Sequence, residues 1–193
     1  MTTPKPPAAA GLRRALACLT VATLGLGLPT VLRAQDRPRR TETVFSPNGG
    51  SASTTAAMID TAERELDIAM YSMSTSSSSP IFAALERAAA RGVKIRMILN
   101  KVYSGARNKQ KGIALEKIGV DVLYVRKTMH EKFAVIDRRL LLNGSANWST
   151  SADKSHSENM QVIPSPRSLV RAFRREYRTL LAESYDFTLE EFE

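Results

Sequence analysis

A histidine and a lysine two positions apart are the side chains in this sequence with the clearest chemical potential. His130 and Lys132 begin the stretch 130–137, which fits the pattern H-x-K-x-x-x-x-D and ends at Asp137. Because side chains alternate along a β-strand, we expect His130 and Lys132 on one face and Asp137 on the other. A neutral imidazole nucleophile and an ammonium group can then converge on one phosphate, while Asp137 accepts hydrogen bonds at the following turn.

Two polar segments downstream could complete such a site. The first is the glycine-containing loop Gly144-Ser145-Ala146-Asn147, and the second is Ser157-Glu158-Asn159. Together with the lysine, Ser145 and Asn147 would hold the non-bridging oxygens of a phosphodiester and stabilise the charge of its transition state. Glu158 is the candidate to bind the far ring nitrogen of the histidine and fix its tautomer.

These three segments, in this order, resemble the phospholipase D superfamily, whose HKD motif is followed by a G-S-x-N loop and, in many members, by a Glu-Asn pair. The likeness is to the small members with a single HKD motif, which include bacterial periplasmic endonucleases and the mitochondrial cardiolipin hydrolase group. It implies a phosphohistidine on His130 and no requirement for a metal. Because two such motifs face each other in this family, it also implies a homodimer with the active site at its two-fold interface. The second copy's histidine would protonate the leaving oxygen.

The elements that must position these residues follow from the apolar pattern of the chain. Short apolar runs alternate with helical periodicity, which predicts an α/β fold with a mixed central β-sheet sandwiched between α-helices. We expect strands at 43–45, 65–71, 93–99, 120–125, 132–136, 140–142 and 159–163. We expect helices at 53–64, 80–91, 113–118 and 168–182, with a polar basic loop over 101–112.

The N-terminal segment has the composition of a targeting signal. Residues 1–34 contain four basic residues and no acidic one, with an apolar run from Ala15 to Leu28 that is short for a membrane span. We therefore predict a signal peptide over 1–34, cleaved near Ala34, and a periplasmic or secreted protein. The alternative is an N-terminal membrane anchor. The predicted domain plan continues with a flexible lead-in at 35–42, a phospholipase D-like catalytic domain at 43–185 and an acidic tail at 186–193.

The charge of the chain indicates a polyanionic partner. Without residues 1–34 it has 24 basic and 19 acidic residues, and five of the acids lie in the last eleven positions. Nucleic acid and an anionic lipid surface satisfy this charge equally well. The predicted loop 101–112 combines cations with an aromatic ring, which suits a single strand of nucleic acid. Its candidate substrate-binding residues are Lys101, Tyr103, Arg107 and Lys109. Five arginines in and just before the last predicted helix could add a basic face.

Three functions remain open at this point. The first is a metal-independent, sequence-nonspecific endonuclease that cleaves DNA or RNA, and the second is a phospholipid hydrolase of the phospholipase D type. The third is a non-catalytic nucleic-acid-binding module, in which His130→Ala would leave function intact. The sequence has two histidines and no metal-ligand spacing, so we expect no cofactor. The second histidine, His156, is assigned a surface position, with substrate contact or proton transfer as the alternative.

Overall fold

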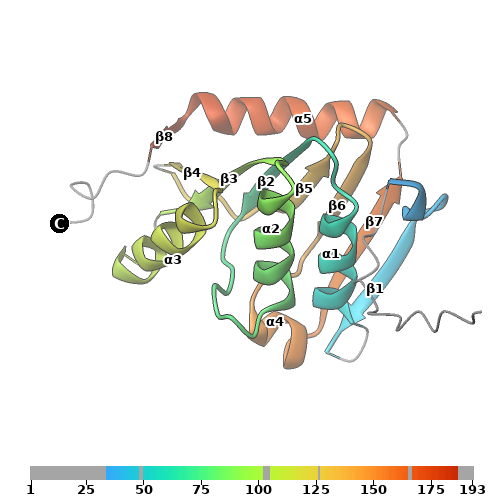
Figure 1. The fold of residues 1–193 in the computed structure, drawn as a ribbon, viewed down its shortest axis with the longest axis horizontal. Coiled ribbons are helices and arrows are strands. Elements are labelled where there is room, and N and C mark those ends of the chain that lie inside the picture. The colour runs from blue at the N-terminus through green and yellow to red at the C-terminus, as the bar shows by residue number, and fades with distance from the viewer. Residues whose placement is uncertain (1–33, 48–49, 102–104, 126, 165–166, 187–193) are drawn as a thin grey trace, which may run out of the picture. The chain divides into compact units, whose positions relative to one another are not determined.

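The computed structural model describes residues 34–47, 50–101, 105–125, 127–164 and 167–186. The predicted signal peptide lies outside these residues except for Ala34. The described chain forms an eight-stranded sheet in the order β1-β7-β6-β5-β2-β3-β4-β8 (Figure 1). Strands β2, β3 and β4 are parallel to one another, and the other pairs are antiparallel. The predicted α/β class with a mixed central sheet is confirmed.

The elements have the following bounds. The strands are β1 Glu42–Ser46, β2 Glu65–Met70, β3 Lys94–Asn100, β4 Asp121–Val125, β5 Lys132–Ile136, β6 Leu140–Gly144, β7 Glu158–Pro164 and β8 Ser184–Asp186. The helices are α1 Ser51–Asp60, α2 Pro80–Ala90, α3 Gly105–Lys117, α4 Thr150–Lys154 and α5 Arg167–Ala182, with a short 3₁₀ turn at Ala34–Asp36.

The alternation of side chains along the strands divides the core into two parts. On β5, Ala134 and Ile136 pack in the cluster that includes α1, α2 and part of α3. Phe133 and Val135 point to the opposite face, where they pack against α5. Figure 1 shows α1 and α2 beside each other and α5 running across the sheet as a separate layer. Strand β5 is buried at all five positions because it lies between these layers.

Local sequence signals account for both ends of helix α2. Ser79 caps α2 by accepting a hydrogen bond from the amide of Phe82, and Pro80 occupies the first turn, where its missing N–H costs nothing. Gly92 follows the helix with a φ of 82°, a conformation that glycine adopts without a Cβ clash. The sequence predicted this helix to within one residue. Helix α1 is shifted relative to its prediction, since it begins at Ser51 and ends at Asp60.

The basic loop expected at 101–112 is largely a helix, so that prediction was wrong. Helix α3 spans Gly105–Lys117 and includes all but the last residue of the short helix that was expected at 113–118. Its first half, ARNKQK after Gly105, contains no large apolar residue, so hydrophobic periodicity cannot reveal it. Alanine, arginine, lysine and glutamine nevertheless have high intrinsic helix propensity. Helix α4 and strand β8 were also not predicted, because both are too short to show a period.

The lead-in expected to be flexible is held against the domain. Arg37 donates to the side chain and the carbonyl of Thr61 and also binds Asp137. Its side chain is only 10% exposed. In the described part of the chain, no helix is both long and apolar enough to cross a membrane.

Candidate active site

The candidate catalytic residues other than Asp137 gather along one edge of the sheet, formed by the strand ends at which β2, β3, β4 and β6 finish and β5 and β7 begin. Lys132, the first residue of β5, pairs with Met70, the last residue of β2. Gly144 ends β6 opposite Met160 of β7. This edge therefore brings together the H-x-K segment, the G-S-x-N loop and the Glu-Asn segment, which are separated by up to 30 positions in the sequence.

The imidazole of His130 and the ammonium of Lys132 are in direct contact. The Nζ of Lys132 lies 3.0 Å from Nδ1 and 3.3 Å from Nε2 of His130, and it donates to the His130 carbonyl at 2.5 Å. The two side chains thus converge, as the alternation of strand residues predicts. The His130 side chain is exposed, so a phosphate could reach both groups from solvent.

Tyr71 is a residue of this site that the sequence analysis did not identify. Its ring packs edge-on against the ring of His130, with 4.5 Å between centroids, and the Nζ of Lys132 lies 5.3 Å from its centroid. The amide of Tyr71 also donates to the carbonyl of Glu131. Tyr71 was placed at the end of the predicted strand 65–71. The clustering of functional residues at the C-terminal ends of parallel strands was a signal that could have found it.

Lys132 is a buried cation. It is 8% exposed, and this burial lowers its pKa below the ordinary lysine value, while the negative charge of Glu158 acts in the opposite direction. A desolvated ammonium group interacts more strongly with an anion than a solvated one does. The group is therefore suited to bind the non-bridging oxygens of a phosphodiester.

The loop after β6 is held tightly to β7. The amides of Ser145 and Ala146 both donate to the carbonyl of Asn159, and the Ser145 Oγ accepts from the Asn159 amide at 3.0 Å. A Cβ added to Gly144 would lie 2.2 Å from that same carbonyl oxygen, so only glycine permits this close approach. The Oδ1 of Asn147 is buried and has no hydrogen-bond partner in the described part of the chain. A buried acceptor without a partner is uncommon in folded proteins.

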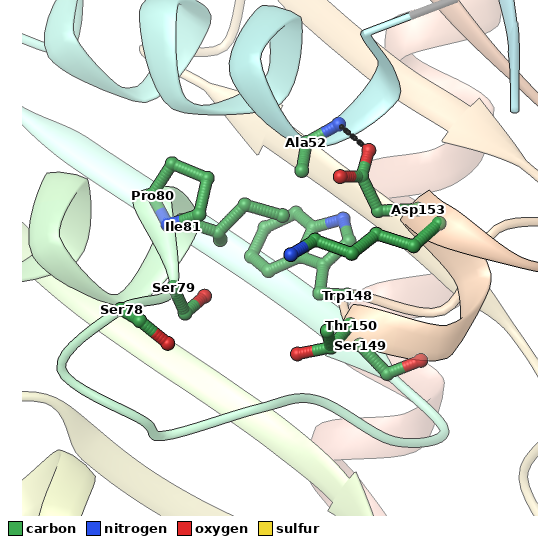
Figure 2. A pocket seen from close by; sticks show the side chains of 10 residues that line it. Ala52, Ser78, Ser79, Pro80, Ile81, Trp148, Ser149, Thr150 and Asp153 are labelled. Atoms are coloured by element: carbon green, nitrogen blue, oxygen red, sulfur yellow. Dashed lines mark hydrogen bonds between the residues drawn. The ribbon is translucent and has the colours of Figure 1, made fainter. Parts of the chain in front are cut away.

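Trp148 anchors this loop from behind. Its amide donates to the carbonyl of Ser72, and its carbonyl accepts from the amide of Ser74 at 2.7 Å. Its side chain lines a small pocket of about 80 Å³, together with residues of the segment 78–81 and of α4 (Figure 2). Figure 2 also shows Asp153 reaching the start of α1, where it accepts from the amide of Ala52. These contacts fix the position from which Asn147 is presented.

His130 and Lys132 open into a pocket of about 430 Å³ between β5, β6 and α5. Its lining also includes two carboxylates, Glu131 and Glu176. Burial raises the pKa of Glu131, and the charge of Glu176 raises it further, while Lys127 opposes both. The pocket thus combines a buried ammonium group with one acidic side chain just before β5 and another on α5.

The hydrogen bond that the sequence analysis expected between Glu158 and the His130 ring is not made in the described structure, although the charge of Glu158 reaches Lys132. Among the described residues, Glu158 makes no hydrogen bond to His130, and its Oε1 lies 3.8 Å from Nδ1 of His156 instead. The reason is the strand order, since β7 is separated from β5 by β6 while the His130 ring turns toward Tyr71 beside β2. Glu158 acts on Lys132 through its charge alone. His156 has a side chain 56% exposed.

Asp137 lies at the far end of β5 from the histidine and has a complete set of partners. Its carboxylate accepts from the backbone amides of residues 63, 64 and 65 at 2.8–3.0 Å and from Arg37. Burial by itself raises the pKa of Asp137, but the hydrogen bonds from Arg37 and the three amides outweigh it and lower that pKa overall. This arrangement connects the β5–β6 turn to the start of β2.

The predicted substrate-binding residues are only partly described. Tyr103 and the side chain of Arg107 lie outside the described residues. The Nζ of Lys101 lies over the ring of Tyr185, 5.2 Å from its centroid, and Lys109 lies on α3. Neither lysine is among the residues that line the His130 pocket. A neighbouring cation, Lys111, donates to the Ser72 Oγ at 3.3 Å and so brings α3 close to the site.

A metal ion has no evident binding position in the described chain. No group of three or more histidine, cysteine, aspartate or glutamate side chains is arranged there to hold one. The imidazole and the ammonium group that line the pocket are suited to an anionic ligand, while its two carboxylates, Glu131 and Glu176, are not arranged with a third metal-binding side chain among the described residues.

The fold and this site define the class of the protein. The sequence profile described as "Cardiolipin synthase, PLD-like domain" matches residues 55–181, which is more than half of the chain. The chain therefore belongs to the phospholipase D-like family, as a member with one H-x-K-x-x-x-x-D motif.

The similar proteins with curated names include cardiolipin hydrolases and phospholipases D. The chain is 34% identical to the mitochondrial cardiolipin hydrolase of Xenopus tropicalis over 132 residues, which cover 65% of this chain and 60% of that protein. It is 35% identical to a phospholipase D of Rickettsia conorii over 125 residues, or 64% of this chain and 61% of that protein. The chain thus spans about 60% of the length of these relatives. Its fold is similar to that of Nuc, a phospholipase D family member from Salmonella typhimurium, with a TM-score of 0.70 and 21% identity over 76% of this chain and 97% of that one.

Proposed function

We propose that the chain is a metal-independent phosphodiesterase that cleaves nucleic acid without sequence specificity through a phosphohistidine on His130. The observation that carries this proposal is the contact between the Lys132 Nζ and the imidazole of His130 at the mouth of an open pocket. In the first step, a ring nitrogen attacks phosphorus and the P–O bond to the leaving oxygen breaks, with a proton delivered to that oxygen. Water then attacks phosphorus, breaks the P–N bond and releases a phosphomonoester.

The buried ammonium group and the loop after β6 would stabilise these steps. Lys132 is charged while its pKa lies above the working pH, and it can bind a non-bridging oxygen as negative charge develops. Ser145 and Asn147 follow the last residue of β6, and the Ser145 hydroxyl and the side-chain NH₂ of Asn147 could donate to another oxygen of the phosphate. The hydrogen bond from the Tyr71 amide to the Glu131 carbonyl and the packing of the Tyr71 ring on His130 limit how far the segment around His130 can shift.

The proposal includes a homodimer, because one chain supplies a single motif histidine. In a two-fold dimer, one His130 attacks while His130 of the second copy donates the proton to the leaving oxygen. The exposure of His130 supports a site that another chain completes. If both histidines are needed, adding an equal amount of His130→Ala protein to wild type and allowing exchange should reduce activity to about half. Unchanged activity would contradict the shared site.

The excess positive charge suits nucleic acid and an anionic lipid surface alike, and nucleic acid is preferred because the segment 101–112 combines cations with an aromatic ring on which a base can stack. The alternative is a phospholipid phosphodiesterase, which the name of the Xenopus tropicalis relative favours. The location is part of the proposal. A signal peptide over residues 1–34 would export the protein to the periplasm or the medium, and an uncleaved N-terminus would instead favour the lipid substrate.

One experiment separates these functions. The purified full chain is incubated with plasmid, single-stranded RNA, cardiolipin vesicles and a small chromogenic phosphodiester in excess EDTA. We expect nucleic acid and the small diester to be cleaved, and His130→Ala to lose this activity by at least about 10³-fold. His156→Ala is the matched control and should retain activity. Cleavage of cardiolipin alone would support the lipid alternative, and binding without any cleavage would support the non-catalytic one.

A further inference from the structure

A second hollow, of about 530 Å³, lies at the opposite end of β5 from His130. Most of its lining side chains are arginines from three separate segments: the connection before β2, the β5–β6 turn and the first half of α5. They are Arg64, Arg138, Arg139, Arg171 and Arg174. We call this feature the arginine groove. The arginines of α5 were visible in the sequence as a basic face, but their convergence with residues near 64 and 138 was not.

The carboxylates at the groove are already engaged. Asp137, which also lines it, accepts three backbone hydrogen bonds and binds Arg37. Glu65 pairs with Arg138, and this hydrogen bond lowers its pKa, to which the charge of Arg174 contributes. The carboxylate of Asp137 is therefore balanced by Arg37 and backbone amides, and that of Glu65 by Arg138, one of the groove arginines.

The positive charges of three of the arginines are not paired with a carboxylate of the described residues. Within the described part of the chain, the side chains of Arg64, Arg139 and Arg171 make no hydrogen bond or ion pair with a protein group. All three residues are exposed. Like charges held together repel one another, and an anion that enters the groove would relieve this repulsion. Guanidinium groups bind phosphate oxygens through paired N–H donors, so a phosphate-rich ligand matches the lining.

We propose that the arginine groove binds the phosphodiester backbone of a nucleic acid strand outside the catalytic pocket. This inference rests on the proposed function, which it extends by assigning a second contact region for the same substrate. The groove is recessed, whereas a membrane surface would meet protruding side chains. Val170, the apolar residue of the lining, is buried and offers no surface for lipid insertion.

Helix α5 connects the groove to the catalytic pocket. Arg171 and Arg174 line the groove, while Ala172, Phe173 and Glu176 line the pocket of His130. The five residues of β5 separate the two regions by about 17 Å, which is the length of about five nucleotide steps along one strand of a duplex. A strand bound in the groove can therefore present a phosphate several nucleotides away to the histidine. A small diester is too short to occupy both regions.

The test compares two double variants that each remove two positive charges. Arg139→Gln/Arg171→Gln alters the groove, and Lys117→Gln/Lys154→Gln is the control at exposed lysines that do not line the groove or the His130 pocket. Each pair is made in the full chain, with and without His130→Ala. The probes are a labelled single-stranded DNA of about 20 nucleotides, a small chromogenic diester and vesicles containing cardiolipin.

We expect the groove variant to bind the DNA about tenfold more weakly at moderate salt, with a plot of log K against log salt concentration about 1.4 less steep. The KM for DNA cleavage should rise similarly, while hydrolysis of the small diester stays within about twofold of wild type. DNA binding equal to that of the control variant would overturn the proposal. A loss confined to vesicle binding would also overturn it and assign the groove to lipid. Because binding is measured in the His130→Ala background, absence of nuclease activity would refute the proposed function without deciding the groove.

Discussion

Replacing Asp137 with asparagine should lower the stability of the folded protein but leave its phosphodiesterase activity largely intact. The Asp137 side chain is 7% exposed and accepts from Arg37 and from the amides of residues 63, 64 and 65. An asparagine keeps one acceptor oxygen, but its amide group would face donors that previously bound the second oxygen. Breaking a buried ion pair from one side costs about 3 to 5 kcal/mol. For a domain of this size, that corresponds to a fall in Tm of roughly 10 °C.

The pH dependence of this effect has a definite sign. The pKa of Asp137 is lowered in the folded protein, so its contribution is present above the unfolded carboxyl value of about 3.9 and is lost as pH falls through the lower folded value. The difference in Tm between wild type and Asp137→Asn should therefore shrink in acid. Arg37→Met should cause a large part of the same loss at pH 7, and the double variant should lose less than the sum. Arg39→Met, at an exposed arginine nearby, is the control.

Thermal unfolding followed by circular dichroism gives the Tm values, and turnover of a small diester at 20 °C reports the chemistry. We expect Asp137→Asn to keep turnover within about threefold, because the carboxylate is separated from His130 by the length of β5. A Tm within about 2 °C of wild type would refute the argument from buried hydrogen bonds. A loss of more than about 10²-fold in turnover in a protein that remains folded would assign Asp137 to the reaction instead.

Three further predictions concern the active-site edge. Burial lowers the pKa of Lys132, and only its charged form would bind phosphate, so activity should decrease as the pH rises, at a pH lower than the ordinary lysine pKa of about 10.4. In a pH–rate profile, Lys132→Arg should move this decrease to higher pH. Gly144→Ala should lower the free energy of unfolding in urea by about 2 kcal/mol or more, because its Cβ would lie 2.2 Å from the Asn159 carbonyl oxygen. Tyr71→Leu should reduce turnover by disturbing the His130 ring, whereas Tyr71→Phe should restore it if ring packing is the reason.

Strand β5 could be predicted from the sequence because every constraint on it is local. Its apolar residues alternate between two covered faces, and the motif positions fall at its ends, so the bounds Lys132–Ile136 and the convergence of lysine with histidine both follow from strand geometry. Helix α3 could not be recognised in the same way. Its first turns depend on the intrinsic propensity of polar residues, which leaves no periodic signal.

The position of Glu158 depended on information that is not local. Its distance from His130 is set by the order of the strands and by the rotation of the imidazole toward Tyr71. Neither is determined by the spacing of residues along the chain. The arginine groove was hidden for the same reason, because Arg64, Arg139 and Arg171 become neighbours only when three segments are folded together.

The H-x-K-x-x-x-x-D motif thus contains strand β5, and the residues at the two ends of this strand have different roles. At one end, Lys132 meets the imidazole, and at the other, Asp137 is fixed by the segment that leads into β2. Strand β5 pairs with β2 and β6 along its length, so a displacement of Asp137 is resisted by these backbone hydrogen bonds before it reaches the lysine. The aspartate can therefore stabilise the fold without contacting the phosphate. The spacing of five residues between lysine and aspartate corresponds to the length of strand that separates these two tasks.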